Sequence, residues 1–389
     1  MRKISVLIAR STAIAPEPRV QRAASCIRRL GLSVHIVGWD RERCFPARAH
    51  FEDGISVERV KVPGRYGGGL TNLVGLAILN LYLLWLVFRL RPCIYHAVDL
   101  DTLLPGLVAK RLFGARIFYD IADWYASSRP RSPRLRRIAP LLRLLNNLER
   151  WALRYADYIC LPHECRLSSV PNALTGRALI IYNSPEDMVD LKGLQVPKIA
   201  QPYFAYTGGL YEDRGITYLG EAARLANTRV ALAGFGPLEA ECRQLAAENP
   251  LVHFFGRVSY ADALALQAFS AGVLILYDPT SEMNQVAAPY KLYEAMMLGK
   301  PIIASDGTPP GELAQRENIG LSIPYGSSSE LARAMRYLLD HQNEAGRMGR
   351  RARRLYLERY SWEVQCRRLQ DAYLRLREML GGVPVATER

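Results

Sequence analysis

Residues 288–306 read Ala288-Pro-Tyr-Lys-Leu-Tyr-Glu-Ala-Met-Met-Leu-Gly-Lys-Pro-Ile-Ile-Ala-Ser-Asp306. The pattern predicts a loop, a helix that begins at Pro289 or at the next residue and ends at Gly299, and then a buried strand. The N–H groups at the start of such a helix attract phosphate, and Lys291 in its first turn adds a full positive charge. Glu294 lies one turn further on the same face, where a carboxylate can accept hydrogen bonds from ribose hydroxyls. Either residue alone would fit a surface Lys–Glu pair on an ordinary amphipathic helix.

The rest of the chain alternates short β-branched runs with helical stretches, which indicates α/β domains with parallel sheets. With 389 residues the chain is long enough for two such domains, and the turn-rich segment 184–202 with its three prolines separates them near residue 195. We expect strands at residues 4–9, 33–38, 55–62, 94–97, 116–119, 158–161 and 178–182, and then at 203–207, 230–233, 252–254, 271–276, 301–304 and 320–323. A first helix is expected at residues 20–30.

The positive charge of the chain is concentrated in its first half. Residues 1–195 carry 29 Lys and Arg against 16 Asp and Glu, so they hold +13 of the formal net charge of +14. This excess predicts an anionic partner for the first half. The run Arg129-Pro-Arg-Ser-Pro-Arg-Leu-Arg-Arg137 raises the alternative of nucleic-acid binding, but no aromatic residue for base stacking lies between Tyr125 and Trp151. We therefore expect no nucleic-acid partner.

The seven cysteines form an odd set without a CxxC motif. Neither a disulfide framework nor a zinc site is expected, and a reducing compartment fits this cysteine usage. The N-terminal apolar run is interrupted at Arg10 after six residues, which is too short for a secretion signal. We interpret it as a buried first strand.

Two segments of the first half suggest contact with a membrane. Residues 70–88 contain nineteen residues without a charge, which meets the length of a transmembrane helix. Because a strand expected at residues 94–97 belongs to the same sheet as the strands before it, we favour a helix of the domain over a span. Residues 134–155 place apolar side chains at helical spacing with arginines around them, typical of a helix in a bilayer interface. A helix that packs on the sheet with solvated arginines is the alternative.

Several motifs in order resemble those of GT-B glycosyltransferases, in particular the retaining glycosyltransferase family four. The helix of residues 288–306 is similar to that family's P-x-K-x-x-E-x-M-x-x-G-x-P-V-I-A helix. The other similar segments are Pro18-Arg19-Val20, Tyr206-Thr-Gly-Gly-Leu-Tyr-Glu-Asp-Arg-Gly-Ile216, Ala233-Gly-Phe-Gly-Pro237, Phe255-Gly-Arg-Val258 and Tyr360-Ser-Trp-Glu363. The resemblance implies two Rossmann-like doubly wound domains: an acceptor domain at residues 1–195 and a nucleotide-sugar domain at 196–358. A terminal helix at 359–381 would pack back on the first domain.

The resemblance further implies transfer of a sugar from a nucleoside-diphosphate donor to an acceptor hydroxyl, in a cleft between the domains. Arg214 and Lys291 would balance the charge that builds on the departing diphosphate, so no metal is expected. The residues implied in donor binding are Gly208, Gly209, Arg214, Gly234, Gly236, Arg257, Val258, Pro289, Tyr290, Lys291, Leu292 and Glu294. Arg19 is the implied acceptor contact on the first domain, and Asp99 joins it because it follows a strand whose carboxyl end faces the cleft.

The sequence departs from the family pattern at two places. The usual E-x7-E pair needs a carboxylate at position 286, where this chain has Val286, and Glu282 lies four residues too early. Nucleotide binding through Glu294 is less affected than the contact to the transferred sugar. The family's histidine after a first-domain strand is replaced by Ala122.

The stereochemistry of transfer therefore stays open between retention, which needs no base, and inversion. If the enzyme inverts, Asp123 or Asp120 is the candidate base. Asp99-Leu-Asp101 forms a D-x-D string of the kind that binds a divalent cation in another glycosyltransferase fold, but this architecture generally works without metal. His96 is expected in the core.

Together these features predict a metal-independent, hexosyl-type and retaining glycosyltransferase that acts on a membrane-held, lipid-linked glycan in cell-surface polysaccharide synthesis. The protein would be cytoplasmic and bound peripherally to the anionic inner face of the cytoplasmic membrane. The alternatives are a GT-B enzyme with a soluble acceptor and, because of Val286 and Ala122, a non-catalytic scaffold with a degenerate donor site.

Overall fold

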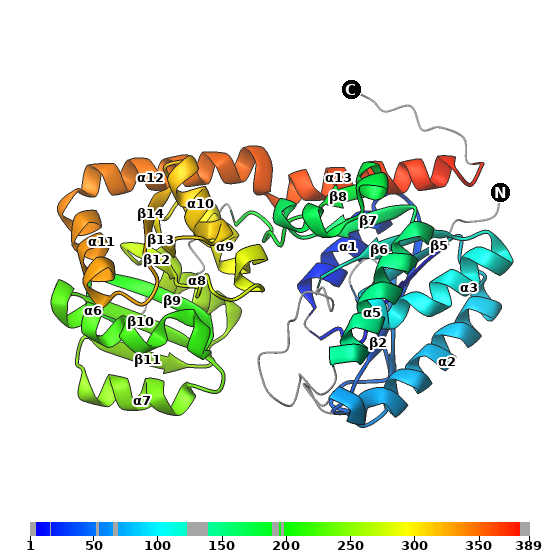
Figure 1. Cartoon of the computed structure of the whole chain (residues 1–389), viewed down its shortest axis with the longest axis horizontal. Coiled ribbons are helices and arrows are strands. Elements are labelled where there is room, and N and C mark those ends of the chain that lie inside the picture. The colour runs from blue at the N-terminus through cyan, green and yellow to red at the C-terminus, as the bar shows by residue number, and fades with distance from the viewer. Residues whose placement is uncertain are drawn as a thin grey trace. The chain divides into compact units, whose positions relative to one another are not determined.

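The computed structural model describes residues 5–15, 17–51, 54–64, 69–122, 139–188, 194–195 and 198–381 (Figure 1). The chain forms two compact units. The first comprises the chain up to Ile181 together with the segment from Cys366, and the second is Tyr182–Gln365. The boundary thus lies before the turn-rich segment rather than near residue 195, because Tyr182 already packs with the rings of Tyr293 and Tyr360 in the second unit.

The first unit contains an eight-stranded sheet in the order β3-β4-β2-β1-β5-β6-β7-β8. Its strands are β1 Ser5–Ala9, β2 Ser33–Trp39, β3 Arg48–Phe51, β4 Ile55–Val60, β5 Ile94–Val98, β6 Arg116–Asp120, β7 Tyr158–Leu161 and β8 Ala178–Ile180. All neighbours are parallel except β3 and β4, which form an antiparallel pair at the edge. The sequence predicted every strand except β3, whose four residues are too exposed to give an apolar run.

Helices cover both faces of this sheet. On one face α1 (Pro18–Arg28) lies beside α13 (Trp362–Glu378), whose residues from Cys366 belong to this unit. On the other face α2 (Leu73–Leu90), α3 (Leu103–Phe113) and α5 (Ala139–Ala152) connect β4, β5, β6 and β7 in turn. The helix expected at residues 134–155 is thus confirmed from Ala139; its first residues lie outside the described ranges.

A disulfide joins Cys26 of α1 to Cys366 of α13, which are 340 positions apart in sequence. The expectation that the cysteines form no disulfide was therefore wrong for this pair. Its two members are far apart in the chain and meet only because both helices pack on the same face of the sheet. The other five cysteines are free thiols.

The second unit contains a six-stranded sheet in the order β11-β10-β9-β12-β13-β14, and all its neighbouring strands are parallel. The strands are β9 Tyr203–Gly209, β10 Arg229–Phe235, β11 Val252–Gly256, β12 Gly272–Ile275, β13 Ile302–Ser305 and β14 Gly320–Ile323. The helices are α6 Leu219–Ala226, α7 Glu239–Glu248, α8 Tyr260–Ala268, α9 Tyr290–Met297, α10 Pro309–Arg316, α11 Ser328–Asp340 and α12 Gln342–Leu355. Two α/β units with parallel sheets confirm the predicted fold class. In both units the parallel strands end at one edge of the sheet, where ligands bind in such folds.

Candidate active site

The loops that follow β9 and β10 approach each other closely at the carboxyl edge of the second sheet. Gly208 and Gly234 are direct neighbours in the parallel register of the two strands. A Cβ on Gly234 would lie 1.8 Å from the Gly208 carbonyl oxygen, so no larger residue fits there. Gly208 has a φ of 131°, and a Cβ on it would lie 3.1 Å from Lys291 Nζ. These glycines therefore allow the backbone to approach the lysine that was predicted to bind phosphate.

Lys291 reaches this edge from the first turn of α9. Its Nζ lies 4.0 Å from the centre of the Tyr206 ring and 5.8 Å from that of Tyr277. Burial, together with the charge of the neighbouring Arg214, lowers the pKa of Lys291 to about 7, although Glu294 opposes this shift. Within the part of the chain that the structure describes, Nζ makes no hydrogen bond. The ammonium is thus held by aromatic faces and keeps its three donors for an anion.

Arg214 lies beside Lys291 and is oriented by its neighbours. Its Nη1 donates to Asn284 Oδ1 at 2.7 Å and forms an ion pair with Asp213 Oδ2 at 2.9 Å, and the guanidinium carbon stands 4.1 Å over the Tyr277 ring. Asn284 is buried, and its Nδ2 donates to Asp213 Oδ2 and to the Asp278 carbonyl, both at 3.0 Å. Sequence reasoning missed Asn284, although it lies two residues before Val286, where the family has its first glutamate.

Glu294 is buried one turn after Lys291 in α9. Its Oε2 accepts a hydrogen bond from Gln267 Nε2 at 2.8 Å, and the same Nε2 lies 2.9 Å from Thr207 Oγ1. Gln267 is fully buried on α8, so it holds the Glu294 carboxylate in a fixed position. The sequence did not point to Gln267, because nothing near it in the chain shows that it faces α9.

The remaining predicted donor residues differ in their surroundings. The guanidinium of Arg257 stands 4.8 Å over the ring of Phe235, which is exposed between Gly234 and Gly236. Val258 packs against the small core beside β9 and β10, and Gly209 is the last residue of β9. Pro289 caps α9 and Tyr290 begins it. Leu292 is buried in the core, and its N–H donates to the Pro289 carbonyl.

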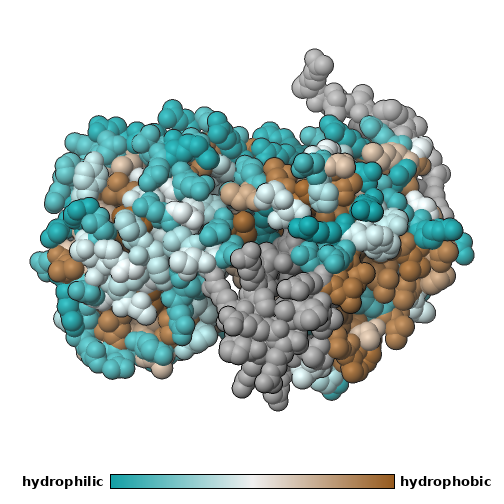
Figure 2. Space-filling model, in the orientation of Figure 1, coloured by the Kyte–Doolittle hydropathy of each residue, from teal (hydrophilic) through white to brown (hydrophobic). Residues whose placement is uncertain are grey.

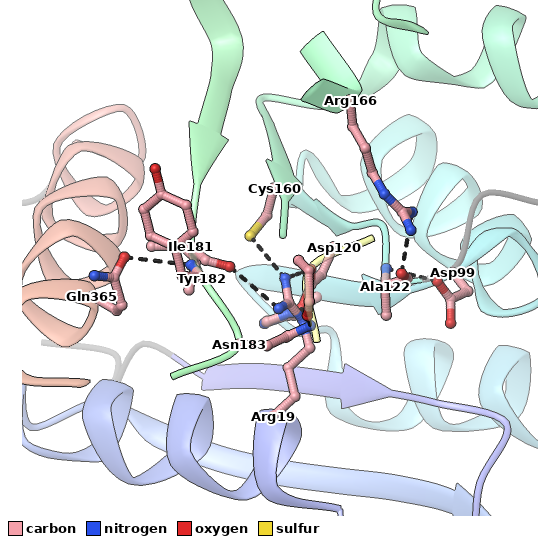
Figure 3. A network of polar contacts seen from close by, with 12 residues as sticks. Arg19, Asp99, Asp120, Ala122, Cys160, Arg166, Ile181, Tyr182, Asn183 and Gln365 are labelled. Carbon is pink, nitrogen blue, oxygen red and sulfur yellow. Dashed lines mark hydrogen bonds and ion pairs between the residues drawn. The ribbon is translucent and has the colours of Figure 1, made fainter. Parts of the chain in front are cut away.

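In the first unit, Arg19 and Asp120 form a buried ion pair (Figure 3). Arg19 Nε and Nη2 donate to the two carboxylate oxygens at 2.8 and 2.5 Å, and Nη1 donates to the Ile181 carbonyl. Burial alone would raise the pKa of Asp120, but the charge and hydrogen bonds of Arg19 and the contact with His96 hold it well below its usual range. A carboxylate in this state is a poor proton acceptor, so the geometry supports a structural pair rather than a base and an acceptor contact.

Asp99 follows β5 at the carboxyl edge of the first sheet. Its backbone has a φ of 64° and a ψ of 167°, a region that residues other than glycine rarely adopt. Its Oδ1 accepts a hydrogen bond from the Ala122 N–H at 2.9 Å, and the Ala122 carbonyl accepts one from Arg166 (Figure 3). Backbone strain of this kind is concentrated at functional sites, and the acceptor contact of Asp99 stays a prediction. His96 is buried as expected, whereas Asp123 lies outside the described residues.

The sequence and the fold were compared with those of known proteins. The model of the glycosyl transferase 4-like domain matches residues 15–172, and that of the glycosyl transferases group 1 matches residues 201–341. One glycosyl transferase model thus matches each of the two units of the chain. Its architecture is GT-B, as in the sucrose-phosphate synthase of Thermosynechococcus elongatus. The chain is similar to that structure with a TM-score of 0.76, 15% identity and coverage of 97% of this chain and 100% of that one.

Two curated proteins are similar to part of this chain. D-rhamnosyltransferase WbpZ of Pseudomonas aeruginosa is 32% identical over 167 residues, which cover 42% of this chain and 43% of that protein. O-antigen chain mannosyltransferase C of Escherichia coli is 28% identical over 181 residues, which cover 46% and 47%. The matched region is thus less than half the length of either relative.

Proposed function

We propose that this glycosyltransferase moves a sugar from a nucleoside-diphosphate sugar to a hydroxyl of a lipid-linked glycan during cell-surface polysaccharide synthesis. The names of its two curated relatives support this substrate class, since one is a D-rhamnosyltransferase and the other an O-antigen chain mannosyltransferase. The transferred sugar is then a hexose or a 6-deoxyhexose.

The observation that carries the proposal is the position of Lys291. A buried ammonium that rests on two tyrosine rings and lies beside Gly208 is poised to bind an anion. The positive charge of the neighbouring Arg214 repels the Lys291 ammonium unless a group with more than one negative charge lies between or beside the two cations. A diphosphate is such a group. Glu294 lies one turn away from Lys291, where its carboxylate can bind the hydroxyls of a ribose.

In this mechanism the two cations stabilise the diphosphate as it leaves the sugar. Their hydrogen bonds strengthen as negative charge grows on the departing oxygen, so they lower the barrier without a metal ion. The pairing of Asp120 with Arg19 leaves this carboxylate unsuited to take the acceptor proton. This supports a retaining reaction, which needs no such base, over inversion with Asp120; the other candidate base, Asp123, lies outside the described residues.

The acceptor is expected to be held at the cytoplasmic face of a membrane, with the protein bound there peripherally. A soluble acceptor and a scaffold without activity are the competing possibilities. The scaffold was suggested by Val286 and Ala122, but Lys291, Arg214 and Glu294 are all present and ordered by buried partners, which favours a working donor site.

The proposal is tested in two steps with the full-length protein. A thermal-shift screen against UDP, GDP, ADP and CMP identifies the base, because a ligand selective for the native state raises the unfolding midpoint. The matching sugar nucleotides are then incubated with a lipid-linked glycan, and the product is detected by mass spectrometry. Transfer that is lost in both Arg214→Ala and Lys291→Ala supports the assignment. Nucleotide binding without transfer to any acceptor would indicate a scaffold, and transfer to free oligosaccharides only would indicate a soluble acceptor.

A further inference from the structure

One helical layer of the first unit carries most of the exposed apolar surface of the described residues. Of twenty-one large apolar or aromatic side chains that are exposed, thirteen lie on α2, α3, α5 and the turn η5 (Leu153–Tyr155) that follows α5. These are Leu73, Val74, Ile78, Leu81, Trp85, Phe88, Leu90, Leu104, Leu112, Leu144, Leu148, Trp151 and Tyr155. Such a concentration marks an interaction surface rather than scattered exposure. Figure 2 shows part of it as a brown area over α2 and α3.

The three helices form a continuous layer on one face of the sheet. Their inner side chains, such as Leu83, Leu103 and Ala152, belong to one core cluster. The rings of Phe88 and Phe113 meet at 5.5 Å between α2 and α3. Lys110 of α3 donates from Nζ to the Tyr155 carbonyl at 2.8 Å, which joins α3 to the end of α5. The exposed apolar side chains therefore share one outer surface.

The helix α2 is long and apolar enough to cross a membrane, but it is anchored to the sheet along its length. A Cβ on Gly75 would lie 2.2 Å from the Trp39 ring, and Tyr82 donates from its hydroxyl to Glu58 at 2.5 Å. The exposed residues Val74, Ile78, Leu81, Trp85 and Phe88 repeat at intervals of four and three, so they form a single stripe on the opposite side. This helix can meet lipid only with that stripe, lying parallel to the bilayer.

The charged side chains on α2, α3, α5 and η5 indicate which kind of partner binds this layer. Among the side chains of these helices and of η5 whose exposure the structure describes, the exposed charged ones are all arginines, at positions 89, 111, 150 and 154. The one acidic residue of the three helices, Glu149, is buried. An anionic bilayer matches both the apolar stripe and its basic surround. A second copy of this chain would bring arginines against arginines, which disfavours a two-fold contact through the same face.

We propose that the outer surface of α2, α3 and α5 is a docking face that lies flat in the headgroup region of an anionic membrane. The role of this membrane, which is to hold the acceptor, rests on the proposed function. Leu81 and Trp85 reach the boundary of the acyl chains, and Arg150 and Arg154 bind lipid phosphates.

Co-sedimentation of the full-length protein with phosphatidylcholine vesicles, with and without phosphatidylglycerol, tests the docking face. Wild type is expected to bind the anionic vesicles and to be weakened by salt. Leu81→Gln with Trp85→Gln should reduce this binding about tenfold or more, because the apolar contact is lost. Arg150→Glu with Arg154→Glu should reduce binding to anionic vesicles by a similar factor and leave the weak binding to neutral vesicles unchanged. The matched control is Tyr337→Gln with Leu357→Gln, two exposed side chains of the second unit that should have no effect.

Equal binding of all variants, or no binding by wild type, would overturn the docking face. A second outcome would also overturn it: wild type is a dimer in sedimentation analysis, and Leu81→Gln with Trp85→Gln makes it a monomer without changing vesicle binding. Circular dichroism and nucleotide binding show whether each variant is folded. The two pairs of substitutions test the apolar contact and the charge separately. Sugar transfer to a detergent-dispersed acceptor is measured in parallel. If wild type transfers the sugar but does not bind vesicles, the docking face alone is overturned. If wild type binds vesicles but transfers no sugar, the result counts against the proposed reaction alone.

Discussion

Lys291 titrates near neutral pH before the donor binds. Burial and the neighbouring Arg214 lower its pKa to about 7, so near this pH the free enzyme holds the side chain partly as the neutral amine. A bound diphosphate stabilises the charged form, which means that donor binding should take up a proton above pH 7.

We expect the affinity for the sugar nucleotide to fall as the pH rises from 7 to 9, by up to about tenfold per pH unit. Calorimetry in buffers of different ionisation enthalpy measures both the affinity and the proton uptake. Lys291→Arg keeps its charge and should remove the pH dependence. An affinity that is constant over this range would show that the Lys291 ammonium does not bind the diphosphate.

Asn284 is a positioning residue for Arg214, because its side chain joins that guanidinium to Asp213 and to the Asp278 carbonyl. We expect Asn284→Ala to lower kcat more than it raises KM, on the order of tenfold to a hundredfold, since the contact of Arg214 with the diphosphate is strongest in the transition state. Gln285→Ala, which changes an exposed neighbour, is the control. Steady-state kinetics measures the effect. A kcat of Asn284→Ala equal to that of wild type would show that Asn284 does not position Arg214 for the reaction.

At the scale of the element, α5 carries a buried carboxyl group as well as exposed apolar side chains. Glu149 is fully buried, and its Oε1 accepts a hydrogen bond from the Tyr119 hydroxyl of β6 at 2.8 Å. Burial raises the pKa of Glu149 to about 7 from its ordinary 4.5. The folded protein therefore keeps a proton between pH 4.5 and 7 that the unfolded chain has released.

This proton uptake makes the first unit less stable as the pH rises. The contribution of Glu149 is fully present below pH 4.5 and is lost as the pH rises through about 7, a change of roughly 3 kcal/mol. Glu149→Gln keeps the hydrogen bond to Tyr119 but cannot ionise, so its unfolding midpoint should lose this dependence and exceed that of wild type at pH 8. Thermal unfolding of both proteins at pH 5 and pH 8 measures the effect. Parallel pH profiles would mean that Glu149 is ionised in the folded protein.

At the scale of the whole molecule, the Cys26–Cys366 disulfide closes a loop that contains the entire second unit. Such a link restricts the unfolded chain, so its reduction should destabilise the first unit by roughly 3–5 kcal/mol. We expect five thiols in the unfolded protein without reductant and seven with it, as measured by thiol titration. Cys26→Ala should lower the unfolding midpoint of the first unit as reduction does, and Cys44→Ala, at an exposed free thiol, should not. Seven thiols without reductant would show that the bond does not form.

The sequence by itself determined the α/β class, the position of nearly every strand and the helix that carries Lys291 and Glu294. The signals for these features come from residues that are neighbours in the chain. An apolar run such as Ile302–Ser305 indicates a buried strand, and a proline and a glycine delimit α9. The edge strand β3 lacked such a local signal.

Only the tertiary structure decided how the polar residues are paired. Arg19 and Asp120 are 101 residues apart, and Arg214 and Asn284 are 70 apart, so their contacts depend on which strands become neighbours in the sheet. The same holds for Cys26 and Cys366, which meet because α1 and α13 share one face. For α2 the sequence showed only that the helix is apolar throughout. The packing of Gly75 and Tyr82 against the sheet decided which side is buried and which side is left exposed, because burial is set by contacts that the chain makes only once it has folded.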